Sequence, residues 1–273
     1  MAIITVSREL AALGDETARE AAKLLNYRFV DKSIIEERMN FFGAESSKFQ
    51  KFDEKKPSLL ASLSKDRDDY LHFLKSAILY EANLGAAVFA GRGAGFFLGD
   101  VPLSFSIFLT APMEIRLERV KSYFHCDNKK ARQILERSDQ ERGGFYRYFF
   151  DADWKEPGIY HLVLNTGLLP PSLCADMIKN MLDRTITEDS EALAQAKISE
   201  LTLGQKIRHH ILYQKELQVH FLDVVVSENM VTLFGVAGSF SVVEAVSSSA
   251  GEIAGGYTIL SKIKIAQDYN VMP

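Results

Sequence analysis

The chain opens with the stretch Ile3-Ile4-Thr5-Val6-Ser7-Arg8-Glu9-Leu10-Ala11-Ala12-Leu13-Gly14-Asp15-Glu16-Thr17. Its first four residues are apolar or β-branched, which is typical of a buried strand. From about Asp15 a helical pattern begins, and it places Ala18, Ala21, Ala22 and Leu25 on one face. Strand, tight loop and helix in this order form the layout that surrounds a phosphate-binding loop.

The loop itself departs from the phosphate-binding pattern G-x-x-x-x-G-K-[ST]. In that pattern the glycines let backbone N–H groups close on a phosphate, and the lysine neutralises its charge. The corresponding residues here are Ala11, Ala12, Leu13, Gly14 and Asp15, with one glycine and no lysine. Side chains in the loop push its backbone away from a phosphate, and Asp15 repels one. Taken alone, the stretch is an ordinary strand-to-helix turn, with Arg8, Arg19 and Lys23 as the nearby basic residues.

Composition narrows the class of protein. The 273 residues suffice for one or two domains, and 47% hydrophobic and 25% charged residues are normal for a globular chain. The net charge of −4 argues against broad nucleic-acid binding. Cys126 and Cys174 are too few for a disulfide framework and lack zinc spacing, so we expect no metal site built from side chains alone. No signal peptide and no membrane-spanning stretch is expected, which favours a bacterial-type cytoplasm.

Strands and helices alternate over the first two thirds of the chain. The predicted strands cover residues 3–6, 27–30, 86–90, 104–109 and 161–164, and the predicted helices begin near 15, 33, 70, 112, 128 and 171. We expect the helix near 128 to end at about Gln140. The polar stretch 41–68 predicts short helices and loops. This alternation predicts an α/β fold with a parallel sheet and helices on both faces. In such sheets ligands bind at the carboxyl ends of the strands.

The composition changes near residue 185, which predicts two domains. We assign residues 1–184 to the first domain and residues 200–273 to the second. Between them, residues 185–199 are acidic and rich in alanine, which indicates a linker or a solvated connecting helix. The second domain has the order α-β-β-α-β, which predicts a small α+β fold. Each part has its own apolar face, so each should fold alone.

Arginines gather at or just beyond the predicted strand ends. They are Arg8, Arg92, Arg116, Arg119, Arg137, Arg142 and Arg147. Phosphoryl transfer depends on positioning and on positive charge around the moving group, and the planar arginine fork binds phosphate well. The alternative is a solvated, salt-bridged surface, since Arg116 and Arg119 lie among Glu114 and Glu118.

Several motifs in their order and spacing resemble the cytidylate kinase-like family. The matching stretches are Ile4–Glu9, Tyr27–Lys32, Gly91–Phe96, Phe108–Arg119, Arg137–Arg142, Tyr146–Phe149 and Leu162–Thr166. The resemblance covers roughly residues 1–183. It implies a P-loop nucleoside-monophosphate-kinase-like fold, with a five-stranded parallel sheet, a flap that binds the monophosphate and a lid.

The resemblance also implies roles for single residues. Arg92 would hold the acceptor monophosphate, Arg137 and Arg142 would be lid arginines, and Asp139 would orient a lid arginine or contact substrate. The remaining candidates for substrate binding are Arg8, Arg116, Arg119 and Arg147. The implied activity is phosphoryl transfer from ATP, with Mg²⁺, to a nucleoside monophosphate. The alternative is a non-catalytic protein that binds a nucleotide, another small phosphorylated ligand or an anion. The loop at residues 11–15 favours the second hypothesis, and the set of arginines favours the first.

The second domain resembles a BON domain. The resemblance rests on Val231-Thr232-Leu233-Phe234-Gly235, followed by a helix, then Gly255-Gly256 and an apolar strand. It implies binding of a phospholipid or another ligand, although no basic patch supports binding to anionic lipid. A plain interaction or dimerisation module is the alternative.

Overall fold

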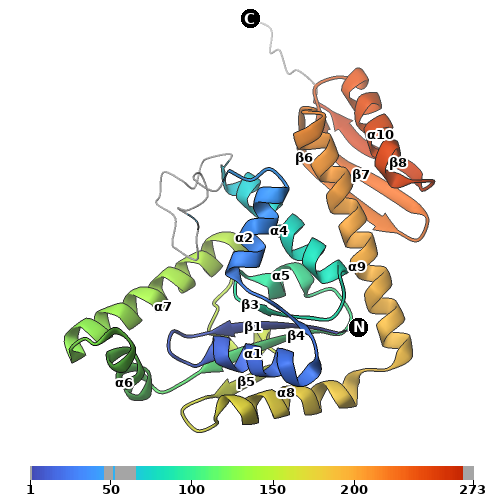
Figure 1. Ribbon diagram of the computed structural model, residues 1–273. Coiled ribbons are helices and arrows are strands. Elements are labelled where there is room, and N and C mark those ends of the chain that lie inside the picture. The colour runs from blue at the N-terminus through green and yellow to red at the C-terminus, as the bar shows by residue number, and fades with distance from the viewer. Residues whose placement is uncertain (1, 46–51, 53–65, 267–273) are drawn as a thin grey trace, which may run out of the picture. The chain divides into compact units, whose positions relative to one another are not determined.

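A computed structural model describes residues 2–45, 52 and 66–266, and these form two compact units. The first unit covers Met1–Gln195 and the second covers Ala196–Pro273. The chain runs from the first unit (blue to yellow) to the second (orange and red) in Figure 1. The short helices and loops expected between residues 41 and 68 fall mostly outside the described residues.

The first unit is built on a five-stranded parallel sheet, as the alternation of strands and helices predicts. Its strands are β1 (Ile3–Arg8), β2 (Arg28–Val30), β3 (Ala87–Ala90), β4 (Ser104–Thr110) and β5 (Leu162–Asn165). Their order is β2-β3-β1-β4-β5, and every neighbouring pair is parallel. The carboxyl ends of β1, β3 and β4 therefore meet at one edge of the sheet.

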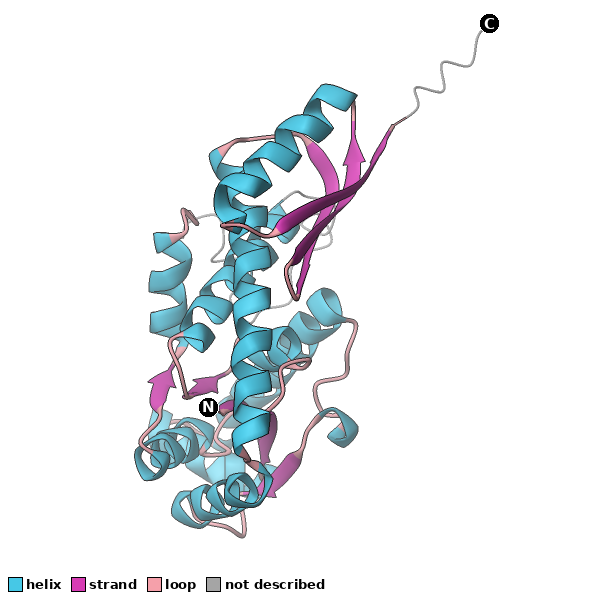
Figure 2. Ribbon diagram, turned by 90° about the vertical axis from the view of Figure 1, so that its right-hand side faces the viewer, coloured by secondary structure: helices cyan, strands magenta, loops and turns pink. Residues whose placement is uncertain are grey.

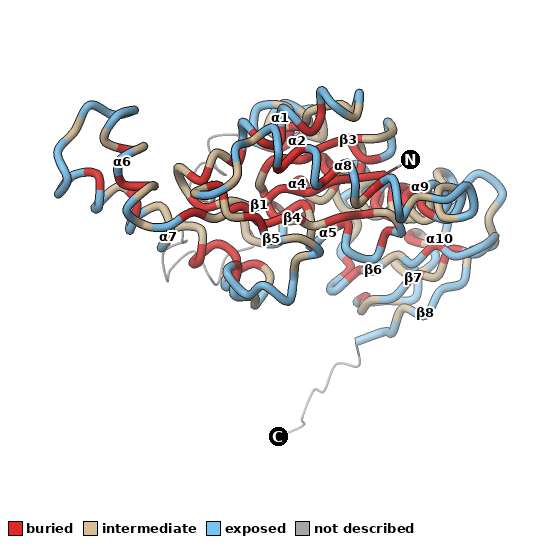
Figure 3. Tube along the Cα trace, turned by 90° about the horizontal axis from the view of Figure 1, so that it is seen from below, coloured by how far each residue is buried: buried red, intermediate tan, exposed pale blue. Residues whose placement is uncertain are grey.

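Helices cover both faces of this sheet. On one face α1 (Gly14–Leu25) and α8 (Pro171–Thr185) pack on an apolar cluster that includes Ile4, Val6 and Ile107. The opposite face carries α5 (Ala94–Leu98), which lies over β1 and β4. Most of the sheet is buried, as the red tube of its strands shows in Figure 3. This burial on both faces explains why β3 is apolar throughout, whereas β4 carries Ser104, Ser106 and Thr110 among its apolar residues.

The remaining helices of the first unit carry many of the charged residues considered below. They are α2 (Lys32–Phe41), α4 (Asp66–Asn83), α6 (Met113–Phe124) and α7 (Asn128–Phe150), and α9 (Glu188–His209) begins in this unit. Helix α7 runs well past its predicted end at Gln140, because Phe145, Tyr146 and Phe149 bury one of its faces. Among the described residues, no helix has both the length and the apolar character needed to cross a membrane.

The second unit is a three-stranded sheet covered by helices. After the α9 helix and the short π-helical turn η4 (His210–Gln214) come β6 (Val219–Ser227), β7 (Met230–Ala237), α10 (Phe240–Ala254) and β8 (Thr258–Ile265). The central strand β7 pairs antiparallel with β6 and parallel with β8. Figure 2 shows these strands in magenta beside the cyan helices. The α-β-β-α-β order predicted from the sequence is therefore present.

The boundary between the two units lies inside α9. Helix α8 ends at Thr185 and α9 begins at Glu188, so most of the stretch 185–199 is helical. The second unit begins at Ala196, and its own core includes Leu222, Val231 and Leu233. A unit with a separate core can fold without the rest of the chain.

We therefore expect residues 196–273, expressed alone, to fold. The fragment should give a cooperative thermal transition and a dispersed NMR spectrum, because its buried side chains pack on one another. A fragment that stays disordered until residues 1–195 are added would show that an element of the second unit depends on the first.

Candidate functional site

The loop between β1 and α1 has a strained backbone. Ala11 and Leu13 have φ angles of 62° and 51°, in the left-handed region that costs a non-glycine residue about 1–2 kcal/mol. The one glycine of the loop, Gly14, is needed for a close contact. A Cβ atom at Gly14 would lie 2.3 Å from Cγ of Arg8. The loop thus adopts glycine-type conformations at positions that hold alanine and leucine.

Three successive carbonyl groups hold the loop in this conformation. The Leu10 carbonyl accepts a hydrogen bond from Arg116 Nε at 2.8 Å, and the Ala11 carbonyl accepts one from Arg119 at 3.0 Å. The Ala12 carbonyl accepts from the Thr166 hydroxyl at 2.9 Å. These donors come from α6 and from the residue that follows β5. Surroundings that fix a segment this firmly can sustain strained φ angles.

Arg8 forms an ion pair across the mouth of the loop. Its guanidinium nitrogen Nη2 lies 2.9 Å from Oδ1 of Asp15, and its side chain passes over Gly14. Asp15 and Glu16 occupy the first turn of α1, where negative side chains interact favourably with the helix dipole. Arg19 instead pairs with Asp31 at 3.5 Å and stacks on Phe29, so Arg8 is the basic residue at the loop.

A pocket of about 630 Å³ lies beside this loop, and we call it the loop pocket. It is lined by the loop residues and by residues of α6 and α7, among them Arg8, Asp15, Glu16, Arg119, Tyr123 and Arg142. A much smaller void, which we call the strand-end void, is lined by Ser7, Arg8, Gly91, Arg142, Tyr146 and Trp154. Arg8 and Arg142 line both spaces. The structure therefore brings these two arginines together at the carboxyl ends of β1 and β3.

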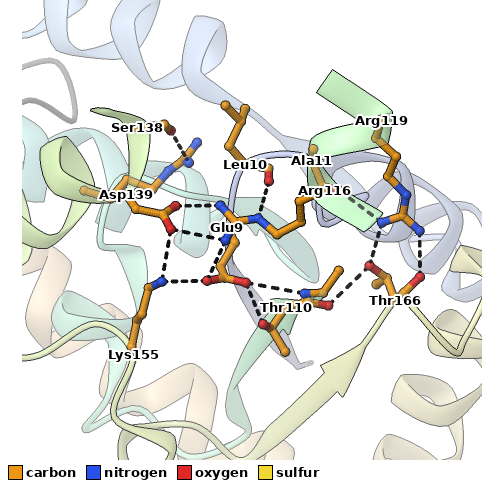
Figure 4. A network of polar contacts seen from close by, with 12 residues as sticks. Glu9, Leu10, Ala11, Thr110, Arg116, Arg119, Ser138, Asp139, Lys155 and Thr166 are labelled. Carbon is orange, nitrogen blue, oxygen red and sulfur yellow. Dashed lines mark hydrogen bonds and ion pairs between the residues drawn. The ribbon is translucent and has the colours of Figure 1, made fainter. Parts of the chain in front are cut away.

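A buried network of charges lies behind the loop (Figure 4). Arg116, which is only 2% exposed, donates to both carboxylate oxygens of Asp139 at 2.7 and 3.1 Å. It also lies 2.9 Å from Glu9. Lys155 bridges the same two carboxylates, at 2.6 Å from Glu9 and 3.1 Å from Asp139. The second Glu9 oxygen accepts from the Thr110 hydroxyl at 2.6 Å. The network in this way joins the loop after β1 to β4, α6, α7 and the segment after α7.

The network keeps the amine of Lys155 positively charged. Burial lowers the pKa of its amine, but the hydrogen bonds to Glu9 and Asp139 outweigh burial, and the pKa lies above its ordinary value. Lys155 therefore stays protonated, and the cluster contains two cations and two anions. A buried cluster of this kind is stable only while every member keeps its partners.

Arg116 and Arg119 are occupied by groups of the protein itself. Each nitrogen of the Arg116 guanidinium donates to Leu10, Glu9 or Asp139. Arg119 donates to the Ala11 carbonyl and to the hydroxyl and carbonyl of Thr166, and it also lines the loop pocket. The alternative interpretation as a solvated face is wrong for Arg116, since its partners come from the loop after β1 and from α7 and not from Glu114 or Glu118. Contact of either arginine with substrate stays a prediction.

The other candidate arginines lie in different surroundings. Arg92 is 3% exposed, pairs with Glu36 at 2.7 Å and has a φ of 60°. Arg142 donates to the Ser138 hydroxyl at 2.7 Å. Arg137 pairs with Glu141 on the same helix, is 77% exposed and lines neither the loop pocket nor the strand-end void. Arg147 is exposed and donates to the Gly143 carbonyl at 3.2 Å. The structure brings Arg142 to the loop, but it does not bring Arg137 or Arg147 there.

Sequence reasoning missed several residues of the site. Lys155 lies in the segment after α7, where no periodic pattern indicates a role. Thr166 and Glu9 lie within the quoted motifs, but the motifs predict no role for them. Thr166 binds the loop at the Ala12 carbonyl, and Glu9 pairs with Arg116. Trp154 and Tyr146 line the strand-end void. Aromatic residues in such a position look like ordinary core residues from the sequence.

Comparison with known proteins places the chain in a family. The model of the cytidylate kinase-like family matches residues 3–168, which is more than half of the chain. The chain belongs to the cytidylate kinase-like family. The kinase-like fold and the family resemblance noted in the motifs are thereby confirmed.

Curated relatives and a solved structure agree with this placement. The chain is 35% identical over 80 residues to the cytidylate kinase of Sulfolobus acidocaldarius, a match of 29% of this chain and 43% of that protein. It is 31% identical over 101 residues to the cytidylate kinase of Thermoplasma acidophilum, covering 36% and 53%. The chain thus spans about half the length of these curated relatives. A solved uncharacterized protein from Eubacterium ventriosum aligns with a TM-score of 0.53 and 21% identity, over 67% of this chain and 99% of that one, and it supports the fold.

Proposed function

We propose that the first unit is a nucleotide kinase that transfers a phosphoryl group from ATP to a nucleoside monophosphate. The observation that carries the proposal is the pair Arg8 and Arg142 at the carboxyl ends of β1 and β3, beside the loop pocket. Two cations at this place stabilise the charge on a phosphoryl group that moves between donor and acceptor. Membership of the cytidylate kinase-like family supports the same reaction class.

In this proposal the residues around the loop have separate roles. The loop pocket holds the ATP phosphates, and Arg8 supplies the positive charge that a lysine supplies in other phosphate-binding loops. Arg142 closes on the transferring group, and Arg92 holds the acceptor monophosphate. Asp139 and Arg116 position the loop through the buried network. Because ATP is the donor, we expect the protein to act in the cytoplasm.

Magnesium fits the donors around the loop pocket. Among the described residues no cluster of three or more histidine, cysteine or acidic side chains could hold a metal ion. Mg²⁺ needs no such cluster, since one or two carboxylates and the phosphates of the nucleotide suffice. Glu16 is an exposed carboxylate that lines the pocket, and it stands at the Ser/Thr position of the loop pattern, whereas Asp15 is paired with Arg8. Glu16 would hold Mg²⁺ together with the phosphates, and the ion would supply positive charge to them.

A specific observation favours a second candidate, a non-catalytic protein that binds a nucleotide or another anion. The Arg8–Asp15 ion pair lies at the place where the loop would receive phosphate, and Asp15 replaces the lysine. The ion pair weakens binding of the ATP phosphates at the loop, whereas Arg92 still binds the acceptor monophosphate. In this candidate the monophosphate binds and no transfer follows.

Calorimetric titrations with ATP·Mg and with CMP, done separately, test the two candidates. We expect CMP to bind more tightly, relative to other kinases of the family, than ATP does, because the loop lacks its lysine. Tight binding of ATP with no binding of any monophosphate would overturn this order. An assay of ADP release with the common nucleoside monophosphates then decides between them, since the enzyme hypothesis fails if none is phosphorylated.

The Arg142→Ala substitution should separate catalysis from stability. If the unit is catalytic, turnover should fall by about 100-fold or more, since the arginine acts mainly in the transition state. Because Arg142 is partly exposed, the melting temperature should change little. Arg132→Ala on the same helix is the matched control, because Arg132 is exposed and pairs only loosely with Glu136 at 4.0 Å. Equal turnover of Arg142→Ala and wild type would remove Arg142 from the mechanism.

For the second unit we propose a BON-like module that binds a phospholipid or another ligand. Its α-β-β-α-β order and its mixed three-stranded sheet support the proposal. Sedimentation with vesicles of phosphatidylcholine and phosphatidylglycerol tests for lipid. If the protein stays in the supernatant and elutes as a dimer in size-exclusion chromatography, the unit is an interaction module instead.

A further inference from the structure

An unusual pair of hydroxyl groups lies in the middle of the parallel sheet. Thr5 on β1 and Ser106 on β4 are cross-strand partners, and the Thr5 hydroxyl donates to Ser106 Oγ at 3.3 Å. Strands of a parallel sheet covered on both faces are normally apolar throughout. The opposite face of the same strands follows this rule with Ile4, Val6 and Ile107. The hydroxyl pair therefore marks one face of the sheet as different.

This pair lines a cavity of about 310 Å³, which we call the hydroxyl pocket. Its polar lining consists of Thr5, Ser7, Ser106, Tyr146, Tyr160 and His161. The pocket is distinct from the loop pocket, with which it shares no lining residue. A volume of this size lies at the lower end of the range for small-molecule sites.

A glycine keeps the two hydroxyl groups open to the pocket. Gly95 of α5 faces them, and a Cβ atom there would lie 3.0 Å from Thr5 Oγ1 and 3.1 Å from Ser106 Oγ. Contacts that short are tighter than nine in ten real Cβ contacts, so even alanine at position 95 presses on both oxygens. The absence of a side chain thus leaves a polar floor that a ligand can reach.

The lining is polar but carries no lysine, arginine, aspartate or glutamate. His161 Nδ1 accepts a hydrogen bond from the Ser106 N–H at 2.9 Å, which assigns the ring proton to Nε2. The ring therefore offers an N–H donor at Nε2. An anion in this pocket would lose its hydration without gaining a cation, so an uncharged ligand is favoured.

The walls of the pocket add flat aromatic surface. Phe96, Tyr146 and Tyr160 line it together with the hydroxyl groups, and the Ser7 hydroxyl lies 3.1 Å from the Tyr146 hydroxyl. Aromatic walls favour a planar ring, and the hydroxyl groups and the imidazole N–H favour a ligand rich in hydrogen-bonding groups. An uncharged ribonucleoside combines both properties.

We propose that the hydroxyl pocket binds an uncharged ribonucleoside. This inference goes beyond the proposed kinase function, because neither Arg92 nor the loop at residues 11–15 lines the pocket. Ser7 and Tyr146 also line the strand-end void beside Arg8 and Arg142, so a bound nucleoside lies next to the basic centre. Binding does not require phosphoryl transfer, and a catalytically inactive protein should bind equally well.

Ligand-observed saturation-transfer NMR with cytidine, uridine, adenosine and guanosine tests the proposal on the full chain. We expect at least one of them to bind. Trp154, the single tryptophan of the chain, provides a second readout, because Tyr160 donates to its carbonyl and its ring lies 6.2 Å from that of Tyr146. Its fluorescence should change on titration.

Two variants assign the binding to this pocket. Gly95→Ala should weaken binding at least tenfold, because the added methyl group covers the hydroxyl pair. Gly251→Ala in α10 is the matched control, since nothing lies within 4 Å of its Cβ position, and it should bind as wild type does. Thr5→Val keeps the shape, removes one hydroxyl and should weaken binding about fivefold. Failure of all four nucleosides to bind, or binding that both Gly95→Ala and Thr5→Val leave unchanged, would overturn the proposal.

Discussion

Replacing Arg116 by alanine is expected to destabilise the first unit by about 3–5 kcal/mol, since the change leaves the buried carboxylate of Glu9 and the partly buried one of Asp139 without their main partner. Arg116 is 2% exposed and holds Glu9, Asp139 and the Leu10 carbonyl together. Lys155 is the remaining cation of the network, and it is far more exposed than Arg116. A loss of this size is a large part of the 5–15 kcal/mol that keeps a typical domain folded.

Urea unfolding followed by circular dichroism measures this effect. Arg132→Ala is the control, because it removes an arginine from an exposed pair of α7, and it should cost less than about 0.5 kcal/mol. Glu9→Gln keeps the shape of the side chain but leaves Arg116 with less charge to balance, and it should fall between the two. If Arg116→Ala has the same urea midpoint as Arg132→Ala, the network does not stabilise the fold.

Asp15→Lys is expected to raise the affinity for ATP·Mg by at least about tenfold, which corresponds to ~1.4 kcal/mol. The substitution places a lysine where the phosphate-binding pattern has one and releases Arg8 from its ion pair. Both changes add positive potential at the loop pocket. The first turn of α1 gains a cation that the helix dipole disfavours, so we expect a small loss of stability in the absence of nucleotide.

The test compares isothermal titrations of three variants. Glu20→Lys makes the same charge change on an exposed position of α1 outside the loop pocket, and its ATP affinity should stay near that of wild type. Asp15→Asn removes the negative charge without adding a positive one and should give an intermediate gain. Equal affinities of Asp15→Lys and Glu20→Lys would mean that phosphate does not bind at this loop.

The sheet could be predicted from the sequence because each strand is a short apolar run with a turn or helix signal after it. The ends of the helices were harder to predict. The sequence pattern predicts a helix that begins near residue 33, but helix α2 begins at Lys32 with Asp31 as its cap, whose carboxylate accepts from the Ser33 and Ile34 N–H groups. Helix α7 continues to Phe150 because its aromatic residues are buried by neighbours distant in the sequence.

The site was harder to predict for the same reason. Spacing along a helix predicts partners three or four residues away, and on that basis Arg116 would pair with neighbouring glutamates. Its partners Glu9 and Asp139 are instead 107 and 23 residues distant. Lys155 follows no periodic pattern, and only the path of the chain after α7 brings it to Glu9. Contacts of this kind depend on the whole fold, which local patterns do not contain.

The left-handed conformations of Ala11 and Leu13 affect how such loops can be recognised in other sequences. Their φ angles are imposed by three carbonyl contacts from α6 and from Thr166, so the shape of the loop belongs to its surroundings more than to its own residues. A peptide of residues 7–17 should not keep this shape in isolation. A search that demands glycines would overlook the loop, whereas one that asks for the donors at Arg116, Arg119 and Thr166 would retrieve it.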